Sequence, residues 1–140
     1  MSEAKPLNWK AEPGIGYTVE RREDGGMNYL FTDLSEKTIN HWKNFAEDHL
    51  LDADRRTRNL YDLREIKEMS EDAIRSAIRL NSDPSARKIR LAVVVANDTI
   101  AEAIRKVAAL ADTNFAAAIQ IFTDVAKAEE WLAKSFEQFA

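Results

Sequence analysis

The segment IRLAVVVA, residues 89–96, contains the longest apolar run in the chain, from Leu91 to Ala96. Its β-branched residues favour a strand, and its length is far below the roughly 20 apolar residues that span a bilayer. A strand that is apolar without alternation is buried on both faces, which is typical of an interior strand of a parallel sheet. We therefore predict that residues 89–96 form a central, buried strand.

Towards the N-terminus, alternation of apolar and polar residues predicts a β-hairpin. Apolar side chains recur at every second position from Ile15 and again from Met27, which is the period of a half-buried strand. Asp24-Gly25-Gly26 lies between the two segments, and glycines supply the positive φ angles that tight hairpin turns require. Residues 15–33 are therefore predicted to form an antiparallel hairpin.

The rest of the chain alternates between helical patterns and short apolar strands. Helical stripes of apolar residues follow Ser35, Ser70, Asn97-Asp98-Thr99 and Thr123-Asp124, the last stripe continuing to Phe136 and Phe139, and further strands are predicted at 58–63 and 118–122. Serine, asparagine and aspartate are preferred N-caps, so these positions mark the starts of helices. The order β-β-α-β-α-β-α-β-α predicts an α/β fold with a mixed five-stranded sheet, in which an N-terminal hairpin precedes parallel strands joined by helices. We assign residues 1–14 to an N-terminal arm and residues 15–140 to a single α/β domain.

The composition excludes several classes of protein. The 140 residues include no cysteine, which excludes structural disulfides, thiolate metal sites and cysteine nucleophiles. The net charge of −4 argues against general nucleic-acid binding, because that function favours a basic domain. The N-terminus has no apolar signal segment and no run is long enough to span a membrane, so we expect a cytoplasmic protein.

The sequence offers few candidates for a phosphate or metal site. All four glycines lie at or before Gly26, so no strand–helix junction can carry a glycine-rich phosphate loop. Asp62, Asp98 and Asp124 are predicted near the carboxyl edge of the sheet, where three acids could bind Mg²⁺. Asp98 and Asp124, however, lie directly before helical stripes, by two residues and one residue, where N-caps belong. We therefore interpret both as caps.

Catalytic side chains are also scarce. His41 and His49 are eight residues apart on one predicted helix, which is too far for the pair to share a metal ion. No serine lies on a glycine-flanked elbow, the setting of the nucleophile in α/β-hydrolases. We predict no catalytic residue, no metal site and no cofactor.

Two candidate binding surfaces remain. Basic residues gather just before the third and fourth strands, at the amino edge of the sheet, as a candidate docking patch: Arg55, Arg56, Arg58, Arg87, Lys88 and Arg90. An acidic partner or an anion would fit such a patch, but charges of this kind also serve solubility and protect strand ends. Three aromatic residues on helical stripes, Trp42, Phe45 and Trp131, are either core residues or the walls of a pocket for an apolar ligand between sheet and helices.

Three stretches of the chain resemble the STAS domain, and more closely its SpoIIAA-like branch of small bacterial proteins. Tyr61-Asp62-Leu63-Arg64 is similar to the end of a strand in that branch, residues 88–94 are similar to its central strand, and residues 122–132 to its closing strand and helix. The resemblance covers about residues 15–135. It implies a STAS-like fold and a non-catalytic role in protein contacts or regulation. Some proteins of the branch are grouped with lipid-binding domains, which implies an apolar ligand as the alternative.

One feature of that family is missing. Anti-sigma-factor antagonists carry a phosphorylated serine in an Asp-Ser-Ser/Thr-Gly motif that opens the second helix, and residues 64–72 lack this motif. Ser70, the nearest serine, is interpreted as a structural helix cap.

The leading hypothesis is a non-catalytic STAS-like binding or regulatory module that acts on an unidentified protein partner, with homodimerisation as a further candidate. The second hypothesis is a carrier or sensor of a small apolar ligand, and the third is an enzyme that uses the acidic carboxyl edge. We expect neither nucleic-acid binding nor a membrane span.

Overall fold

The structure is a computed structural model that describes residues 9–10, 12–24, 26–51, 57–81, 89–110 and 118–134. Along the chain its elements are β1 (Tyr17–Arg21), β2 (Met27–Phe31), α1 (Glu36–Leu51), β3 (Thr57–Asp62), α2 (Glu71–Asn81), β4 (Ile89–Val94), α3 (Asp98–Leu110), β5 (Ala118–Phe122) and α4 (Val125–Ala133). This order confirms the predicted alternation of strands and helices.

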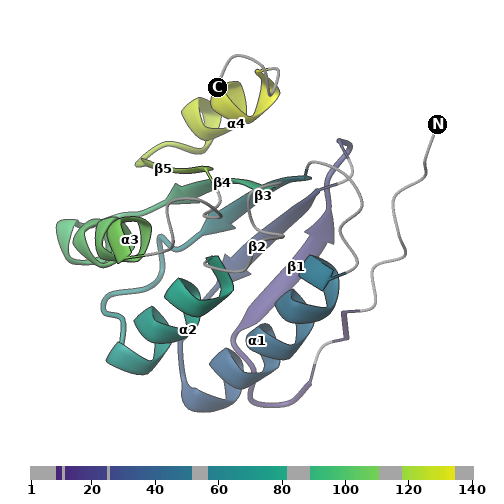
Figure 1. The fold of residues 1–140 in the computed structure, drawn as a ribbon, viewed down its shortest axis with the longest axis vertical. Helices are drawn as coiled ribbons and strands as arrows, with labels where there is room; N and C mark the ends of the chain where they lie inside the picture. Colours follow the sequence, from purple (N-terminus) through teal and green to yellow (C-terminus); the bar gives the residue numbers. More distant parts are fainter. Residues whose placement is uncertain are drawn as a thin grey trace.

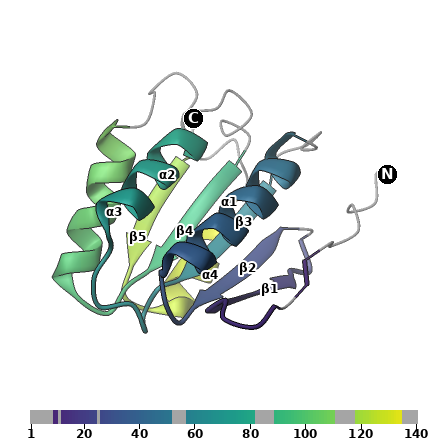
Figure 2. The ribbon, with the colours of Figure 1, turned by 90° about the horizontal axis from the view of Figure 1, so that it is seen from below.

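The five strands form one mixed sheet in the order β1-β2-β3-β4-β5. β1 and β2 pair antiparallel, with Tyr17 opposite Phe31 and Arg21 opposite Met27, while the three later pairings are parallel. The predicted hairpin and the predicted parallel strands are therefore both confirmed. Helices α1, α2 and α3 cover one face of the sheet and α4 alone covers the other (Figure 1). Seen from below, α1, α2 and α3 lie side by side in front of the sheet (Figure 2).

β4 is buried on both faces, as its unbroken apolar run predicts. It lies between β3 and β5, and the segment from Leu91 to Val95 is buried throughout. Successive side chains of a strand point to opposite faces, so β4 contributes to two separate cores.

The larger core lies between the sheet and helices α1–α3. Its aromatic rings come from four elements and stack or meet edge to face. They are Tyr17 of β1, Tyr29 and Phe31 of β2, Trp42 and Phe45 of α1, and Tyr61 of β3. The smaller core lies under α4 and consists of Leu60, Ala92, Val94, Ala128, Trp131 and Leu132. Residues 135–140 lie outside the described residues, so the predicted continuation of the last stripe to Phe136 and Phe139 does too.

Gly26 does not supply the positive φ angle that was predicted for the hairpin turn. Gly14, with φ of 87°, has the only positive φ among the described residues, so Gly26 is not in the left-handed region. A Cβ atom on Gly26 would lie 1.5 Å from the backbone carbonyl oxygen of Arg58. Gly26 is therefore needed for the close approach of β2 to β3. Gly25 lies outside the described residues.

Polar side chains cap the helices at the predicted starts, with one correction. The hydroxyl oxygens of Ser35 and Ser70 accept hydrogen bonds from Thr38 N and Ala73 N at 3.4 Å and 3.1 Å. At α4, Asp124 Oδ1 accepts from Ala126 N at 2.7 Å and from Lys127 N at 3.3 Å.

At α3 the cap is Asn97, whose Oδ1 accepts from Ile100 N at 2.9 Å. The prediction that Asp98 caps this helix was therefore wrong. Asp98 is the first residue of the helix, where an acid favours the helix dipole without capping it.

Candidate functional site

Trp42 and Phe45, two of the predicted pocket residues, lie in the larger core. Their exposed fractions are 7% and 8%. The Trp42 indole Nε1 donates a hydrogen bond to the hydroxyl of Tyr61 at 3.0 Å, and its ring meets Phe31 edge to face. Phe45 meets Tyr29 in the same way. Protein side chains thus occupy the space around both rings.

Trp131 lies on the opposite face of the sheet, in the smaller core beneath α4. Its ring contacts Phe122, with centroids 5.9 Å apart, and the guanidinium carbon of Arg90 lies 5.4 Å from its centroid. The structure therefore does not bring Trp131 to Trp42 and Phe45, and the three rings do not line one pocket. A helical stripe shows that a residue faces a sheet, but not which face of the sheet it meets.

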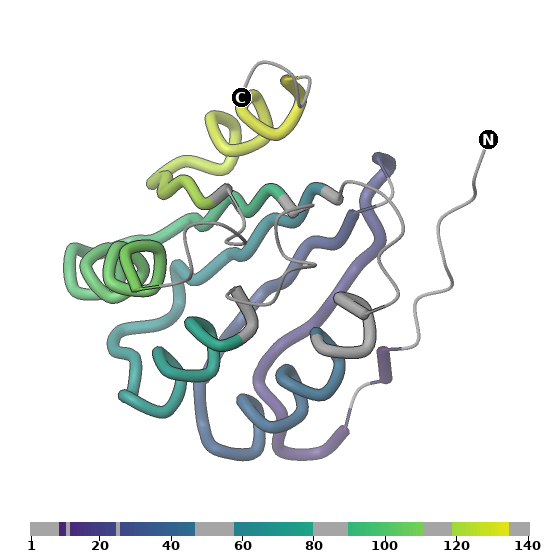
Figure 3. Tube along the Cα trace, in the orientation of Figure 1, coloured from purple at the N-terminus to yellow at the C-terminus, as the bar shows by residue number. Residues whose placement is uncertain are grey.

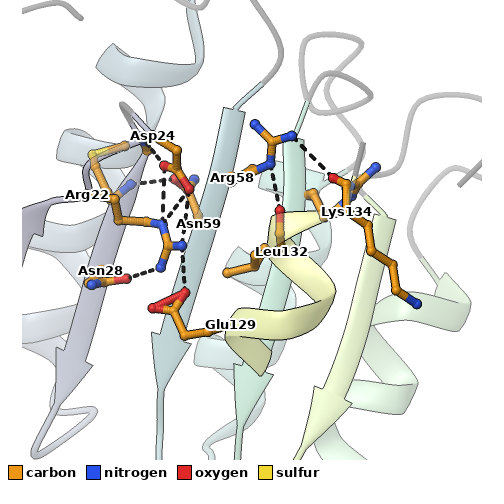
Figure 4. Close-up of polar contacts among 11 residues, drawn as sticks. Arg22, Asp24, Asn28, Arg58, Asn59, Glu129, Leu132 and Lys134 are labelled. Carbon is orange, nitrogen blue, oxygen red and sulfur yellow. Dashed lines mark hydrogen bonds and ion pairs between the residues drawn. The ribbon is translucent and has the colours of Figure 1, made fainter. Parts of the chain in front are cut away.

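Two residues of the predicted docking patch, Arg58 and Arg90, bind backbone carbonyls at the C-terminal end of α4. Figure 4 shows the contacts of Arg58. Arg58 Nε donates to Leu132 O at 2.7 Å, and Arg90 Nη1 donates to Lys134 O at 3.0 Å. The last carbonyls of a helix have no partner within the helix and carry partial negative charge, which explains why arginines bind them. Arg90 is 1% exposed, so its side chain is not on the surface. The other four patch residues, Arg55, Arg56, Arg87 and Lys88, lie outside the described residues.

A third arginine, Arg22, binds a side chain of α4, Glu129. The sequence did not indicate this arginine as a candidate. Its Nη2 donates to Glu129 Oε1 at 2.6 Å, its Nη1 donates to Asn28 Oδ1 at 2.7 Å, and it also pairs with Asp24 (Figure 4). Burial disfavours the charge on Arg22, but the hydrogen bonds to Glu129 and Asp24 outweigh it and raise the arginine pKa. The sequence spacing of Arg22 and Glu129 gives no sign of this contact, because it joins residues 107 positions apart.

The three acids predicted near the carboxyl edge of the sheet, Asp62, Asp98 and Asp124, each have a different structural role. Asp62 accepts two hydrogen bonds from the Arg64 side chain, at 3.0 Å and 2.7 Å. Partial burial opposes the charge on Asp62, but the hydrogen bonds from Arg64 outweigh it and lower the carboxyl pKa. Asp124 caps α4 and Asp98 opens α3. Among the described residues, no three histidine, cysteine or carboxylate side chains gather as a metal site requires.

His41 forms a polar cluster with Tyr17 and Glu12. The Tyr17 hydroxyl lies 2.6 Å from His41 Nδ1, and His41 Nε2 lies 3.7 Å from Glu12 Oε1. Burial raises the pKa of Tyr17 to about 12, so the hydroxyl keeps its proton. Hydroxyl, imidazole and carboxylate follow one another as in a nucleophilic relay, but Tyr17 is only 3% exposed and its oxygen is not open to a substrate. The cluster instead joins β1 to α1. The side chain of His49 is not described.

A groove of about 580 Å³ runs along the surface between α1 and α2. Each helix contributes residues at positions i, i+3, i+4 and i+7, so one face of each helix forms one wall: Glu36, Ile39, Asn40 and Lys43 from α1, and Asp72, Arg75, Ser76 and Arg79 from α2. Leu34 and the capping residue Ser70 close the end at which both helices begin. Sequence reasoning missed this groove because it followed the apolar stripes, and these walls are mostly polar.

None of the helices in the described ranges is long and apolar enough to cross a bilayer.

No curated protein matches the chain. Among solved structures, the chain is similar to an uncharacterised protein of the DUF3478 family with a SpoIIAA-like fold from Shewanella loihica PV-4. The TM-score is 0.62 and the sequence identity 17%, and the match covers 89% of this chain and all of the other. The model of the SpoIIAA-like family matches residues 29–133. Because this family model covers residues 29–133, which is three quarters of the chain, the chain belongs to the SpoIIAA-like family.

Proposed function

We propose that this protein is a non-catalytic binding module that acts through protein contacts, with the groove between α1 and α2 as its contact surface. The observation that carries the proposal is the groove itself. It is open to solvent and lined mostly by charged and polar side chains, most of them exposed, from two parallel helices. Such a surface suits a polar, reversible protein contact more than a small-molecule site, which is usually concave and apolar.

The carrier hypothesis has less support. An apolar ligand between the sheet and its helices would have to displace packed aromatic rings, because Trp42 contacts Phe31 and Tyr61 while Phe45 contacts Tyr29. Trp131 cannot complete the same pocket from the opposite face. The enzyme hypothesis is also weaker, since the acids at the carboxyl edge are engaged in a cap and in an ion pair with arginine.

Site-specific photo-crosslinking in the cells that produce the protein tests the proposed contact surface. A benzophenone amino acid replaces Asn40, an exposed residue of the groove. The matched control carries the same amino acid at Glu102, an exposed residue of α3. We expect a discrete crosslinked protein product with the first variant and not with the second. No protein product at Asn40, or the same product at both positions, would contradict the proposal.

Native mass spectrometry separates the binding module from the carrier. The purified protein should have the mass of the polypeptide, or of a complex of polypeptides. An additional mass of a few hundred daltons that is lost on denaturation would instead favour the carrier.

A further inference from the structure

The groove between α1 and α2 has a charge axis. At the end where the helices begin, the walls carry the acidic residues Glu36 and Asp72, and about two turns further they carry the basic residues Lys43 and Arg79. Arg75, between the ends, pairs with Asp72 at 2.7 Å. α1 and α2 run in the same direction, since each follows one strand and precedes the next parallel strand (Figure 3). The two acidic residues therefore lie at one end of the groove and the two basic residues at the other.

A surface with this charge axis is complementary to a copy of itself. A two-fold axis perpendicular to both helices reverses their direction, so the acidic end of one groove meets the basic end of the other. Isologous contacts in symmetric dimers have this property, because the same patch serves both subunits. Two parallel helices of one copy would then pack antiparallel to those of the second.

We propose that two copies of this chain meet across their α1–α2 grooves, with Glu36 and Asp72 of each copy facing Lys43 and Arg79 of the other. The inference rests on the proposed function, since it takes the groove as the contact surface and names a second copy as its occupant. Glu36, Asp72, Arg75 and Arg79 are exposed and Lys43 is half-buried, while Leu34 and Ile39 are the only apolar residues that line the groove. Interfaces of this composition are reversible and depend on salt.

Charge reversal tests the pairing. In the acidic variant, Lys43→Glu and Arg79→Glu make both ends of the groove negative; in the basic variant, Glu36→Lys and Asp72→Lys make both ends positive. Each variant should repel its own copies, while a mixture of the two should associate, because every negative end then meets a positive end. Analytical ultracentrifugation over a concentration series measures the dissociation constants. We expect that of each variant alone to rise by roughly tenfold or more and that of the mixture to return towards the wild-type value.

Matched controls change the same net charge elsewhere. Lys106→Glu with Lys127→Glu corresponds to the acidic variant, and Glu102→Lys with Glu130→Lys to the basic one; all four residues are exposed on α3 or α4. Wild-type association should also weaken as salt shortens the Debye length from about 10 Å at 0.1 M to about 3 Å at 1 M. Circular dichroism melting establishes that every variant is folded.

Three results would overturn the second-copy proposal: a wild-type protein that stays monomeric at low salt, variants that associate like wild type, or a mixture that gains nothing over its components. None of these removes the proposed function, because a different protein could still occupy the groove. That case is recognised when the Asn40 crosslink contains a polypeptide other than this chain. Absence of any crosslink at Asn40 would contradict both proposals.

Discussion

At position 26, glycine is required by the neighbouring strand and not by its own backbone angles. The missing side chain leaves room for the carbonyl of Arg58, which a Cβ atom would approach to 1.5 Å. This obstacle is backbone, so no side-chain rotation relieves it. Gly26→Ala should therefore separate β2 from β3 and lower the free energy of unfolding by roughly 2 kcal/mol or more.

Urea denaturation measures this loss, with Thr18→Ala on the exposed face of β1 as the control. A loss below about 0.5 kcal/mol, the range of ordinary surface substitutions, would show that the strands separate easily at this point.

Asp33 links stability to pH through the turn before α1. Its Oδ1 accepts hydrogen bonds from Ser35 N at 2.9 Å and from the Thr38 hydroxyl at 2.7 Å, and these bonds lower the carboxyl pKa below 3.8, its ordinary value. A carboxyl whose folded pKa is lowered binds protons more readily when unfolded. Its contribution to stability is thus complete above about pH 3.8 and is lost as the pH falls through the folded pKa.

Asp33→Asn keeps an oxygen that can accept both hydrogen bonds but removes the titration. The free energy of unfolding of this variant should fall less steeply than that of wild type as the pH drops from about 5 to about 2. Denaturation curves at a series of pH values measure both slopes. Parallel curves for the two proteins would mean that Asp33 titrates alike in the folded and unfolded chains.

At the scale of residues, the sequence could predict the helix caps better than the contacts of the arginines. Ser35, Ser70 and Asp124 were identified because a cap occupies a fixed position relative to an apolar stripe, whereas Asn97 was missed by one residue, the usual uncertainty of a helix boundary. Arg58 and Arg90 looked like surface charges. Their targets, the carbonyls at the end of α4, lie 44 and more positions away in sequence, and nothing local encodes that distance.

At the scale of elements, α2 depends on the hydroxyl of Ser70, which accepts from Ala73 N at 3.1 Å. Ser70→Ala removes an N-cap and should lower the free energy of unfolding by about 1 kcal/mol, while Ser70→Asp should retain most of it, because aspartate caps about as well as serine. Thermal or urea denaturation of the two variants measures the difference. Unchanged stability of Ser70→Ala together with loss of a protein partner would instead favour a regulatory serine.

The placement of the helices follows in part from the direction of the strands. α1, α2 and α3 each connect neighbouring parallel strands in one continuing order, and right-handed crossovers put all three on the same face. α4 follows the last strand and connects to no further strand, so the handedness of crossovers does not determine its face. This freedom explains why the sequence could place Trp42 and Trp131 on apolar helix faces but could not tell that the sheet separates them.

At the scale of the whole molecule, one sheet separates two cores of unequal size. The larger core fills the space beneath three helices with stacked aromatic rings, and the smaller core lies beneath a single short helix. Polar contacts add to the smaller apolar area, since Arg58 of β3 and Arg90 of β4 bind the end of α4 and Arg22 of the hairpin turn binds its Glu129. The side of the molecule that carries α4 therefore depends on arginine contacts as well as on packing, and the side that carries α1–α3 depends mainly on packing.

This division predicts which pairs of substitutions are energetically coupled. Val94 and Leu132 belong to the smaller core and are both fully buried, whereas Phe31 belongs to the larger core on the opposite face. Val94→Ala alone should cost roughly 1–3 kcal/mol, as truncation of a buried aliphatic side chain does. Combined with Leu132→Ala, its cost should depart from the sum of the single effects by about 0.5 kcal/mol or more, because the two truncations open a shared space that can relax once. Combined with Phe31→Leu, the costs should add to within about 0.5 kcal/mol, since the sheet backbone lies between the two sites.

Urea denaturation of the single and double variants measures both coupling energies. Equal coupling in the two pairs would mean that the sheet transmits packing changes from one face to the other, and that the molecule has a single core in energetic terms.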